Sequence, residues 1–313
     1  MRLSSACARV GIVLLLFASV LSSYQQSSKR HHGFREVPPF HLPTGVKAEQ
    51  NLIYAQYGKR VLHLDLYHPA DGKGPFPGVV FIHGGGWVGG PLIQFRRQAA
   101  YMASRGFVAE TIEYRLAPEA PYPAAIYDCK AAVRWMRANA KQFKIDPHKI
   151  AAAGGSAGGH LAAMLGVTDG IRSFEGHGGN PTFSSRVQAV VSFNGIYDFV
   201  SIVERSSGGA PIDRMAERFL GGPLQQIPEV YVAASPISHV CKDSAPFLLL
   251  HGTADTTSPY RQALEMQQAL ESVGVRADLF TAKGANHGFF NRPPYYQPAL
   301  ERTVQFLHSV FVE

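Results

Sequence analysis

The spacing of hydrophobic residues changes along the chain, and the changes mark different kinds of element. Apolar and polar residues alternate over 52–57 and again over 61–67, on either side of Gly58-Lys59-Arg60, which is typical of a β-hairpin. After a turn-rich loop over 69–77, short apolar runs alternate with segments whose apolar residues recur at helical spacing. The pattern therefore predicts a hairpin followed by alternating strands and helices.

The predicted elements after the hairpin keep this alternation to the C-terminus. Strands are expected over 78–83, 107–114, 149–153, 187–193, 247–251 and 276–281, and helices over 92–105, 124–143, the run after 156, 259–272 and 297–311. Such an order implies right-handed crossovers and a mostly parallel sheet covered by helices on both faces. The predicted fold class is α/β, with residues 47–313 forming one domain.

Two segments interrupt the alternation. Residues 169–185 are rich in glycine, and residues 200–245 are mixed in character and contain prolines. Sheets of this type bind ligands at the carboxyl ends of their strands. Both insertions are therefore candidates for a small cap over a site at that edge, although each is also compatible with a surface excursion.

Composition and charge indicate which kinds of binding partner the protein is expected to have. The chain has 313 residues, of which 46% are hydrophobic and 17% charged, as expected for a globular protein with one sizeable core. The formal net charge is +7, but part of it lies in the first 35 residues, and the remainder shows no basic cluster interleaved with aromatic residues. We therefore expect no nucleic-acid partner. The oligomeric state is not predicted.

The N-terminus resembles a secretory leader. Arg2 and Arg9 precede an apolar run over 10–21 that ends at Ser22 and Ser23, so residues 1–23 predict a signal peptide. An uncleaved anchor is the alternative, but the run is short for a membrane span. We expect a secreted or periplasmic protein without stable membrane association after cleavage. The polar, proline-containing residues 24–46 predict a flexible linker.

The cysteine content of the expected mature chain is low. After removal of the leader, Cys129 and Cys241 are the only cysteines, so a disulfide-dense scaffold is excluded. We expect two separate thiols.

Residues 150–163, IAAAGGSAGGHLAA, join a strand pattern to a helix pattern through a glycine-rich turn. Residues 154–158 fit G-x-S-x-G, which in this context predicts a nucleophile elbow carrying Ser156. The small flanking residues allow close backbone packing, and the helix N-terminus favours negative charge beside the serine. Because an ordinary Gly/Ser-rich turn has the same composition, this interpretation depends on partner residues elsewhere.

A run of glycines follows the strand predicted at 78–83. The sequence HGGGW over 83–87 offers backbone N–H groups that a ligand can approach without intervening side chains. Acyl transfer requires such donors for the tetrahedral oxyanion, and we expect them from Gly84, Gly85 and Ala157. His83 is expected to orient the loop rather than to act as an acid or base.

A serine nucleophile also needs a base and an acid, and their order along this kind of chain is serine, acid, histidine. Asp255 follows the strand at 247–251, and His287 follows the strand at 276–281. Asp198 is a competing acid, but Asp255 fits the order better. The chain carries no Cys/His pattern with metal-ligand spacing, so neither a catalytic metal nor a cofactor is predicted.

Together these motifs resemble the α/β-hydrolase carboxylesterases, in particular the bacterial feruloyl/acetyl-xylan esterase-like branch related to the hormone-sensitive-lipase-like esterases. The resemblance covers about residue 51 to the C-terminus and rests on HGGGW at 83–87, YRLAPEAPYPAA at 114–125, GGSAGGH at 154–160, HGTADTTSP at 251–259 and NHGF at 286–289. It implies an α/β-hydrolase fold and a secreted serine esterase with the triad Ser156, Asp255 and His287.

The resemblance also bears on the substrate. Gly86 and Trp87 are expected to help line the substrate site. Hormone-sensitive-lipase-like enzymes usually carry an acidic residue before the serine, whereas this chain has Gly155. This departure favours the feruloyl/acetyl-xylan-like branch and leaves open whether the ester is a small molecule or is linked to a polysaccharide.

Three alternatives remain at this stage. Gly84-x-Gly86-x-x-Gly89 with Glu110 or Glu113 downstream fits a dinucleotide-binding loop, but that interpretation leaves the serine, acid and histidine motifs unexplained. A catalytically inactive binding protein on the same scaffold is the second, because fold does not fix function. Amidase or lactonase activity, which uses the same machinery, is the third.

Overall fold

The structure is a computed structural model that describes residues 40–117, 119–206 and 210–312. The predicted signal peptide at 1–23 lies outside these residues, as does most of the predicted linker at 24–46. A single compact unit begins at Leu42 and contains every helix and strand described below.

One mixed sheet forms the centre of this unit, with the strand order β1-β2-β4-β3-β5-β6-β7-β8. The pairs β1–β2 and β2–β4 are antiparallel, and all the other neighbours are parallel. The strands are β1 (Val46–Tyr57), β2 (Arg60–Pro69), β3 (Phe76–Ile82), β4 (Val108–Ile112), β5 (Ile145–Gly155), β6 (Ala189–Phe193), β7 (Phe247–Gly252) and β8 (Ala277–Ala282). The predicted N-terminal hairpin and mostly parallel sheet are confirmed.

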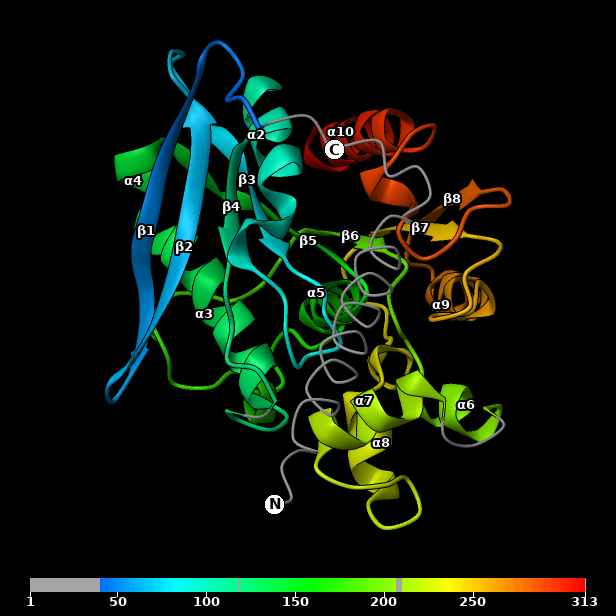
Figure 1. Cartoon of the computed structure of the whole chain (residues 1–313). Helices are drawn as coiled ribbons and strands as arrows, with labels where there is room; N and C mark the ends of the chain where they lie inside the picture. The colour runs from blue at the N-terminus through cyan, green and yellow to red at the C-terminus, as the bar shows by residue number, and fades with distance from the viewer. Residues whose placement is uncertain (1–39, 118, 207–209, 313) are drawn as a thin grey trace, which may run out of the picture. The chain divides into compact units, whose positions relative to one another are not determined.

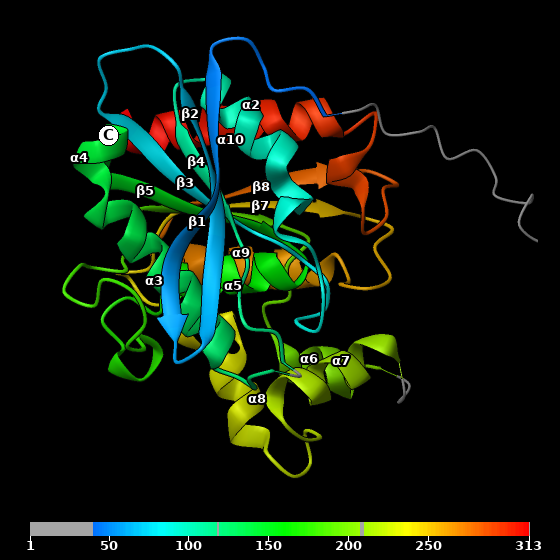
Figure 2. The same cartoon turned by 60° about the vertical axis from the view of Figure 1, so that its left-hand side comes forward.

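Helices cover both faces of the sheet (Figures 1 and 2). Helices α2 and α10 pack on one face, and α3, α5 and α9 on the other. Their bounds, with those of the neighbouring α4, are α2 (Arg96–Ser104), α3 (Ala124–Ala138), α4 (Ala140–Phe143), α5 (Ala157–Val167), α9 (Arg261–Ser272) and α10 (Tyr296–Val312). Because both faces are covered, the central strands β3 and β5 are apolar on both sides, as their uninterrupted hydrophobic runs require.

Two helices predicted as continuous are divided in the structure. The segment 92–105 begins with a 3-10 turn, η1 (Leu92–Phe95), before α2, and the segment 124–143 is split into α3 and α4 at Asn139. The Asn139 side chain donates to the Trp135 carbonyl at 2.9 Å. An asparagine that bonds to the backbone in this way competes with regular helix geometry, which accounts for the break.

The first insertion, 169–185, packs against α3 rather than over the carboxyl edge of the sheet. The Lys130 ammonium of α3, almost fully buried, donates to Glu175 at 2.6 Å and to the carbonyl of Thr168 at 2.8 Å. Arg134, one turn further along α3, donates to the carbonyls of Glu175 and Gly179 at 3.0 Å each. These contacts fix the insertion to the flank of the domain.

The second insertion forms a helical lobe that the sequence pattern did not resolve into elements. It contains α6 (Phe199–Glu204), α7 (Pro211–Leu220), α8 (Pro228–Ala234) and the 3-10 turn η3 (Pro236–His239). In Figures 1 and 2 the three helices lie together beyond α5, on the side away from the sheet. Proline opens α7 and α8, the position where its missing N–H costs nothing, and Gly221 ends α7 in the left-handed conformation.

One carboxyl group in the sheet has no hydrogen-bond partner among the residues that the structure describes. Glu110 of β4 is fully buried, between Leu66 of β2 and Val80 of β3, and neither of its carboxylate oxygens forms a hydrogen bond. Burial raises the pKa of Glu110 well above its usual value, because ionisation would place an unpaired charge among apolar side chains. The folded protein therefore holds this proton more tightly than the unfolded chain does.

This linkage gives a prediction for stability. The free energy of unfolding should fall as pH rises above the unfolded pKa of glutamate, and replacement by an uncharged isostere should remove that fall. We expect the advantage of Glu110→Gln over the wild type to grow between pH 5 and pH 8, by up to about 1.4 kcal/mol per pH unit. Urea unfolding at each pH measures it. The control Glu271→Gln, on the exposed end of α9, should show no such trend; a pH-independent difference for Glu110→Gln would contradict the assignment.

Candidate active site

Ser156 occupies the sharp turn between β5 and α5. Its backbone has φ 56° and ψ −120°, a strained conformation for a residue with a side chain. The Ser156 N–H donates to the carbonyl of Phe193 on β6 at 2.9 Å, which fixes the turn to the neighbouring strand. The serine is thus held at the carboxyl edge of the sheet and at the N-terminus of α5.

Close packing around this turn explains two of its glycines. A Cβ on Gly158 would overlap the carbonyl oxygen of Ile82 on β3, so α5 approaches the sheet only because this position lacks a side chain. A Cβ on Gly155 would lie 2.7 Å from Phe290 and 3.0 Å from Phe95, whose rings stack in parallel 5.6 Å apart. Any side chain at the position before the serine would require this aromatic pair to shift.

The three predicted triad residues come together from separate loops. His287 Nε2 lies 2.8 Å from Ser156 Oγ, and His287 Nδ1 lies 2.8 Å from Asp255 Oδ2. The Asp255 side chain is fully buried, while that of His287 is 29% exposed. With Nδ1–H donating to the carboxylate, Nε2 is left as an acceptor toward the serine hydroxyl, which is the tautomer a general base needs.

The surroundings of Asp255 keep it ionised. Burial opposes ionisation, but hydrogen bonds from His251 and His287, attraction to His287 and the N–H of Ser258 outweigh it and hold the pKa of Asp255 well below its usual range. Oδ1 accepts the N–H groups of Thr257 and Ser258, at 2.9 Å each. The carboxylate is therefore oriented by donors on both of its oxygens.

Asp198, the competing acid, has a different role. Its carboxylate accepts the Ser201 N–H at 3.0 Å and caps the N-terminus of α6.

Two further residues contact the triad, and the sequence analysis did not assign either to the site. The amide nitrogen of Asn194, directly after β6, lies 2.8 Å from His287 Nδ1 and 3.1 Å from Nε2, so this side chain packs against the imidazole. His251, at the end of β7, places Nε2 3.4 Å from Asp255 Oδ2 and donates to the carbonyl of Ser258 at 2.7 Å. Asn194 directly follows a buried strand and His251 lies at the carboxyl end of the next one, and this position at the same sheet edge is the signal that would have identified them.

The glycine-rich loop lies beside the serine, but one of its N–H groups has a partner. Gly84 N–H donates to Gln94 Oε1 at 2.6 Å, so it is not free to bind an oxyanion in this arrangement, contrary to the expected role. Gly85 lines the same cavity as Ser156. Ala157 is the first residue of α5, where the N–H has no intrahelical acceptor. Gly85 and Ala157 remain the candidate donors.

His83 joins the glycine-rich loop to Tyr114. Its ring stacks on Tyr114 at 4.3 Å, and Nδ1 donates to the Gly84 carbonyl at 2.8 Å. Burial lowers the pKa of His83, so the imidazole is neutral near pH 7. This geometry agrees with the expected orienting role.

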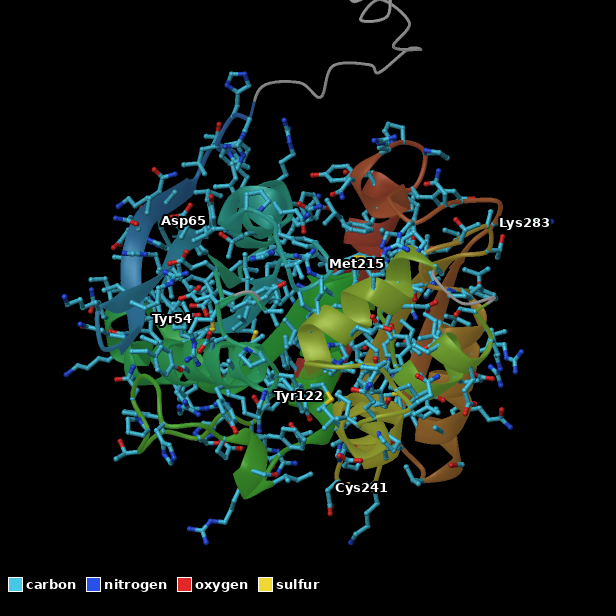
Figure 3. All side chains as sticks on the ribbon, turned by 60° about the horizontal axis from the view of Figure 1, so that its bottom comes forward. Tyr54, Asp65, Tyr122, Met215, Cys241 and Lys283 are labelled. Carbon is cyan, nitrogen blue, oxygen red and sulfur yellow. The ribbon has the colours of Figure 1, made fainter. Side chains whose placement is uncertain are left out.

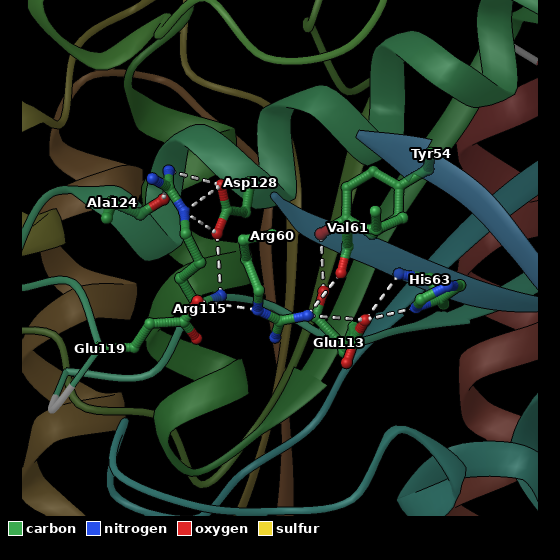
Figure 4. A network of polar contacts seen from close by, with 9 residues as sticks. All are labelled: Tyr54, Arg60, Val61, His63, Glu113, Arg115, Glu119, Ala124 and Asp128. Carbon is green, nitrogen blue, oxygen red and sulfur yellow. Dashed lines mark hydrogen bonds and ion pairs between the residues drawn. The ribbon is translucent and has the colours of Figure 1, made fainter. Parts of the chain in front are cut away.

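The segment around Tyr114 is itself anchored by ionic contacts (Figure 4). The Arg115 guanidinium donates to both oxygens of the fully buried Asp128 on α3, with Nη2 2.7 Å from Oδ1, and stacks over the Tyr57 ring at 3.6 Å. Glu113 accepts the backbone N–H of His63 at 2.8 Å and its Nδ1–H at 2.9 Å. The loop that supports the glycines is thereby fixed to α3 and to the hairpin.

A cavity of about 360 Å³ opens over Ser156 and His287. The glycine loop, Asn194 and the aromatic ring of Phe290 line it, together with Ile212 and Met215 of α7. Figure 3 shows Met215 on this helix. The second insertion thus contributes to the walls, whereas 169–185 contributes no residue to them.

Trp87 lines the cavity but is almost entirely buried. Its ring stacks on Phe219 of α7 at 4.7 Å, and its Nε1–H donates to His160 Nδ1 at 3.1 Å. His160 in turn donates through Nε2 to the carbonyl of Ala234 on α8 at 2.8 Å, and burial lowers its pKa to about 4. The indole therefore mainly joins the glycine loop to the lobe. Gly86 lines the cavity in direct contact with Met215, because a Cβ at this position would overlap the Met215 sulfur.

Other features of the described residues add little to the site. Within 40–117, 119–206 and 210–312 no group of His, Cys, Asp or Glu side chains is arranged to hold a metal ion. Cys129 is buried and Cys241 exposed, and both are free thiols, as expected.

No helix in the described part of the chain has the length and apolar character needed to cross a bilayer.

Comparisons with known proteins agree with this architecture. The BD-FAE family matches residues 64–270, well over half of the chain. The esterase LipC of Mycobacterium tuberculosis is 36% identical over 219 residues, which cover 69% of this chain and 53% of LipC. The chain thus spans about half the length of the curated relatives it matches.

Two solved structures are similar to this chain over nearly their whole length. A truncated carbohydrate esterase from gut microbiota superposes with a TM-score of 0.75 at 28% identity, covering 85% of this chain and 97% of that one. The butyrate-bound esterase Est2 of Thermogutta terrifontis superposes with a TM-score of 0.71 at 32% identity, covering 86% and 98%. The resemblance expected from the motifs is confirmed: the chain belongs to the BD-FAE family, within the α/β-hydrolase carboxylesterases.

Proposed function

We propose that this protein is a serine carboxylesterase in which Ser156, His287 and Asp255 form the catalytic triad. The observation that carries the proposal is the continuous hydrogen-bonded chain from Ser156 Oγ through the imidazole to a buried carboxylate, at the floor of an open cavity. Such a chain can activate a hydroxyl for attack on a carbonyl.

The first half-reaction forms an acyl-enzyme. Ser156 Oγ attacks the ester carbonyl carbon while His287 Nε2 takes the hydroxyl proton, and the ionised Asp255 stabilises the resulting imidazolium. The negative charge on the carbonyl oxygen is bound by the N–H groups of Gly85 and Ala157, and the loss of one such donor typically costs about 3 kcal/mol of barrier. The tetrahedral intermediate then expels the alcohol, which takes the proton from His287.

The second half-reaction repeats these steps with water. His287 Nε2 removes a proton from a water molecule as its oxygen attacks the acyl carbon, and the same N–H groups bind the oxyanion. Collapse of the intermediate returns the proton to Ser156 Oγ and releases the carboxylic acid. The complete cycle consumes the ester and one water molecule and releases the alcohol and the carboxylic acid.

For the substrate we propose short-chain or carbohydrate-linked acetyl or feruloyl esters. A cavity of about 360 Å³ walled by Met215 and Phe290 suits a small acyl group. The names of the similar structures, a carbohydrate esterase and a butyrate-bound esterase, agree with this range. The leader-like residues 1–23 favour a secreted or periplasmic location, where such esters are accessible.

The nucleophile assignment is tested by Ser156→Ala. We expect turnover of p-nitrophenyl acetate to fall at least about a thousandfold, because no other group can form the acyl-enzyme. Circular dichroism and the unfolding midpoint should stay close to the wild type. Retained activity would refute the assignment, and activity lost together with the folded spectrum would call for Ser156→Cys as a second variant.

The two candidate acids are separated by paired substitutions. Asp255→Asn should lower kcat about 10³–10⁴-fold, because the amide would favour the wrong imidazole tautomer. Asp198→Asn should change kcat by less than about threefold, because asparagine is an equally good helix cap. Equal losses in the two variants, measured with p-nitrophenyl acetate, would contradict the assignment of Asp255 as the triad acid.

The size of the cavity predicts an acyl-chain profile. With p-nitrophenyl esters, kcat/KM for acetate to butyrate should exceed that for octanoate by about tenfold or more, because long chains would meet Met215 and Phe290. Met215→Ala should shift the profile toward longer chains, whereas Val232→Ala, at an exposed position on α8, should not. A wild-type preference for octanoate would exclude the proposed acyl range.

The same assays address the alternatives. Faster hydrolysis of an anilide or a lactone than of the matched ester would indicate an amidase or a lactonase on this machinery.

A further inference from the structure

A second cavity adjoins the catalytic one. It has a volume of about 430 Å³ and lies between α6, α7 and the N-terminal end of α9. Ile212 and Thr257 line both cavities. Thr257 follows Asp255 by two residues and donates its N–H to that carboxylate, so the second cavity begins at the loop that carries the proposed catalytic acid.

Two arginines form a positively charged wall of this cavity. Arg205 follows the last residue of α6, and Arg261 is the first residue of α9. A cation at a helix N-terminus opposes the helix dipole, and an arginine four residues before a glutamate is the less favourable order for such a pair. The position of Arg261 is therefore not explained by helix stability, and residues that break a local rule are candidates for function.

The two arginines share a single ionic partner, Glu265, among the described residues. Both donate to the same atom, Glu265 Oε1, through Arg205 Nη1 at 3.2 Å and Arg261 Nε at 2.7 Å. No other ionic partner of either arginine occurs among the described residues. Within this trio two positive charges face one negative charge, which leaves guanidinium N–H groups that can bind a planar anion. The carboxylates of Asp198 and Asp213, which also lie beside the cavity, accept the N–H groups of Ser201 and Ala210 and form no ion pair with either arginine.

Gln262, which lines the cavity, is held in place by hydrogen bonds within the protein. Gln262 is 4% exposed, and its Oε1 accepts the N–H groups of Tyr197 and Asp198 at 2.8 Å each. Its Nε2 donates to the Asp198 carbonyl at 3.2 Å and to Ser201 Oγ at 3.1 Å. This fully bonded side chain fixes the start of α9 to the start of α6, and hence fixes the spacing between the two arginine-bearing helices.

We propose that this cavity binds a carboxylate group of an acidic ester substrate whose ester bond lies at Ser156. The proposal rests on the proposed esterase function and adds a preference for substrates that carry a negative charge away from the scissile bond. Guanidinium groups bind carboxylates through paired, charge-assisted hydrogen bonds. Thr256 and Ser201, which carry hydroxyl groups, also line the cavity. A neutral sugar could form hydrogen bonds with these hydroxyl groups, but it would gain little binding energy from the two arginine cations.

Isosteric ester pairs test the charge preference directly. Monomethyl adipate and methyl adipamate place a carboxylate or a carboxamide on the acyl part, and 6-acetoxyhexanoate and 6-acetoxyhexanamide place the same groups on the alcohol part. Hydrolysis by the full chain is followed by pH-stat titration. We expect kcat/KM for the carboxylate to exceed that for the carboxamide by about tenfold in one pair at low ionic strength, with the preference declining as salt is added.

Charge-removing variants assign the preference to the cavity. Arg205→Gln and Arg261→Gln should each reduce the carboxylate-to-carboxamide ratio about threefold or more, and the double variant should bring it close to one. Arg172→Gln removes the same charge from an exposed position on the other insertion and should leave the ratio unchanged. A ratio that falls equally in Arg172→Gln would mean that overall charge, not this cavity, sets the preference, and would overturn the proposal.

The outcomes separate this inference from the esterase proposal. If the carboxamide esters are hydrolysed but neither pair shows a preference, the cavity proposal is wrong and the esterase proposal stands. If no ester is hydrolysed, calorimetric titration of Ser156→Ala with monomethyl adipate and methyl adipamate decides the binding question alone. Tighter binding of the acid, lost in the double arginine variant, would support the cavity, and equal binding of the two ligands would reject it.

Discussion

The imidazole of His287 depends on contacts at both of its nitrogens, and the rest of the site depends on the orientation of that ring. Nδ1 is directed at a buried carboxylate and Nε2 at the serine hydroxyl, while the Asn194 amide lies against the ring. A ring held in this way cannot exchange its tautomer or rotate without losing a hydrogen bond to an ionised group. The rest of the fold brings loops that are distant in the sequence to this one ring.

The sheet brings these loops to one edge. Ser156 follows β5, Asn194 follows β6, Asp255 follows β7 and His287 follows β8, and these four strands are consecutive neighbours in the sheet. Parallel pairing sets all their carboxyl ends on one side. The burial of the strands therefore does more than stabilise the protein, because any change in register between neighbours would displace one of the groups around the imidazole.

Much of this arrangement could be predicted from the sequence. Uninterrupted apolar runs that alternate with segments of helical spacing predicted the sheet, and the motifs in the loops after three of these runs identified Ser156, Asp255 and His287. The short helices α6 to α8 were not predicted, because segments of six to ten residues carry too few apolar repeats to define a period. Where the lobe packs depends on tertiary contacts, such as the stacking of Trp87 on Phe219, that no local pattern encodes.

The glycine loop shows a second limit of sequence patterns. The motif over 83–87 indicates that N–H groups are available, but it does not reveal that the Gln94 side chain occupies the one on Gly84. Similarly, Gly155 stood out in the sequence as a departure from related esterases. The rings that a side chain at this position would meet, those of Phe95 and Phe290, belong to residues far from it along the chain. Both features follow from side chains meeting in space rather than from their spacing in the sequence.

The position of the Trp87 indole has a consequence for how substrate range could change in this family. The indole packs between the loop beside Ser156 and Phe219 of the lobe, and it is joined to α5 and α8 through His160. A displacement of the lobe, which is how a lid commonly widens an entrance, would therefore also displace the backbone of the glycine loop. New specificities in this chain would therefore arise by exchanging individual side chains on α7 rather than by opening the lobe as a unit.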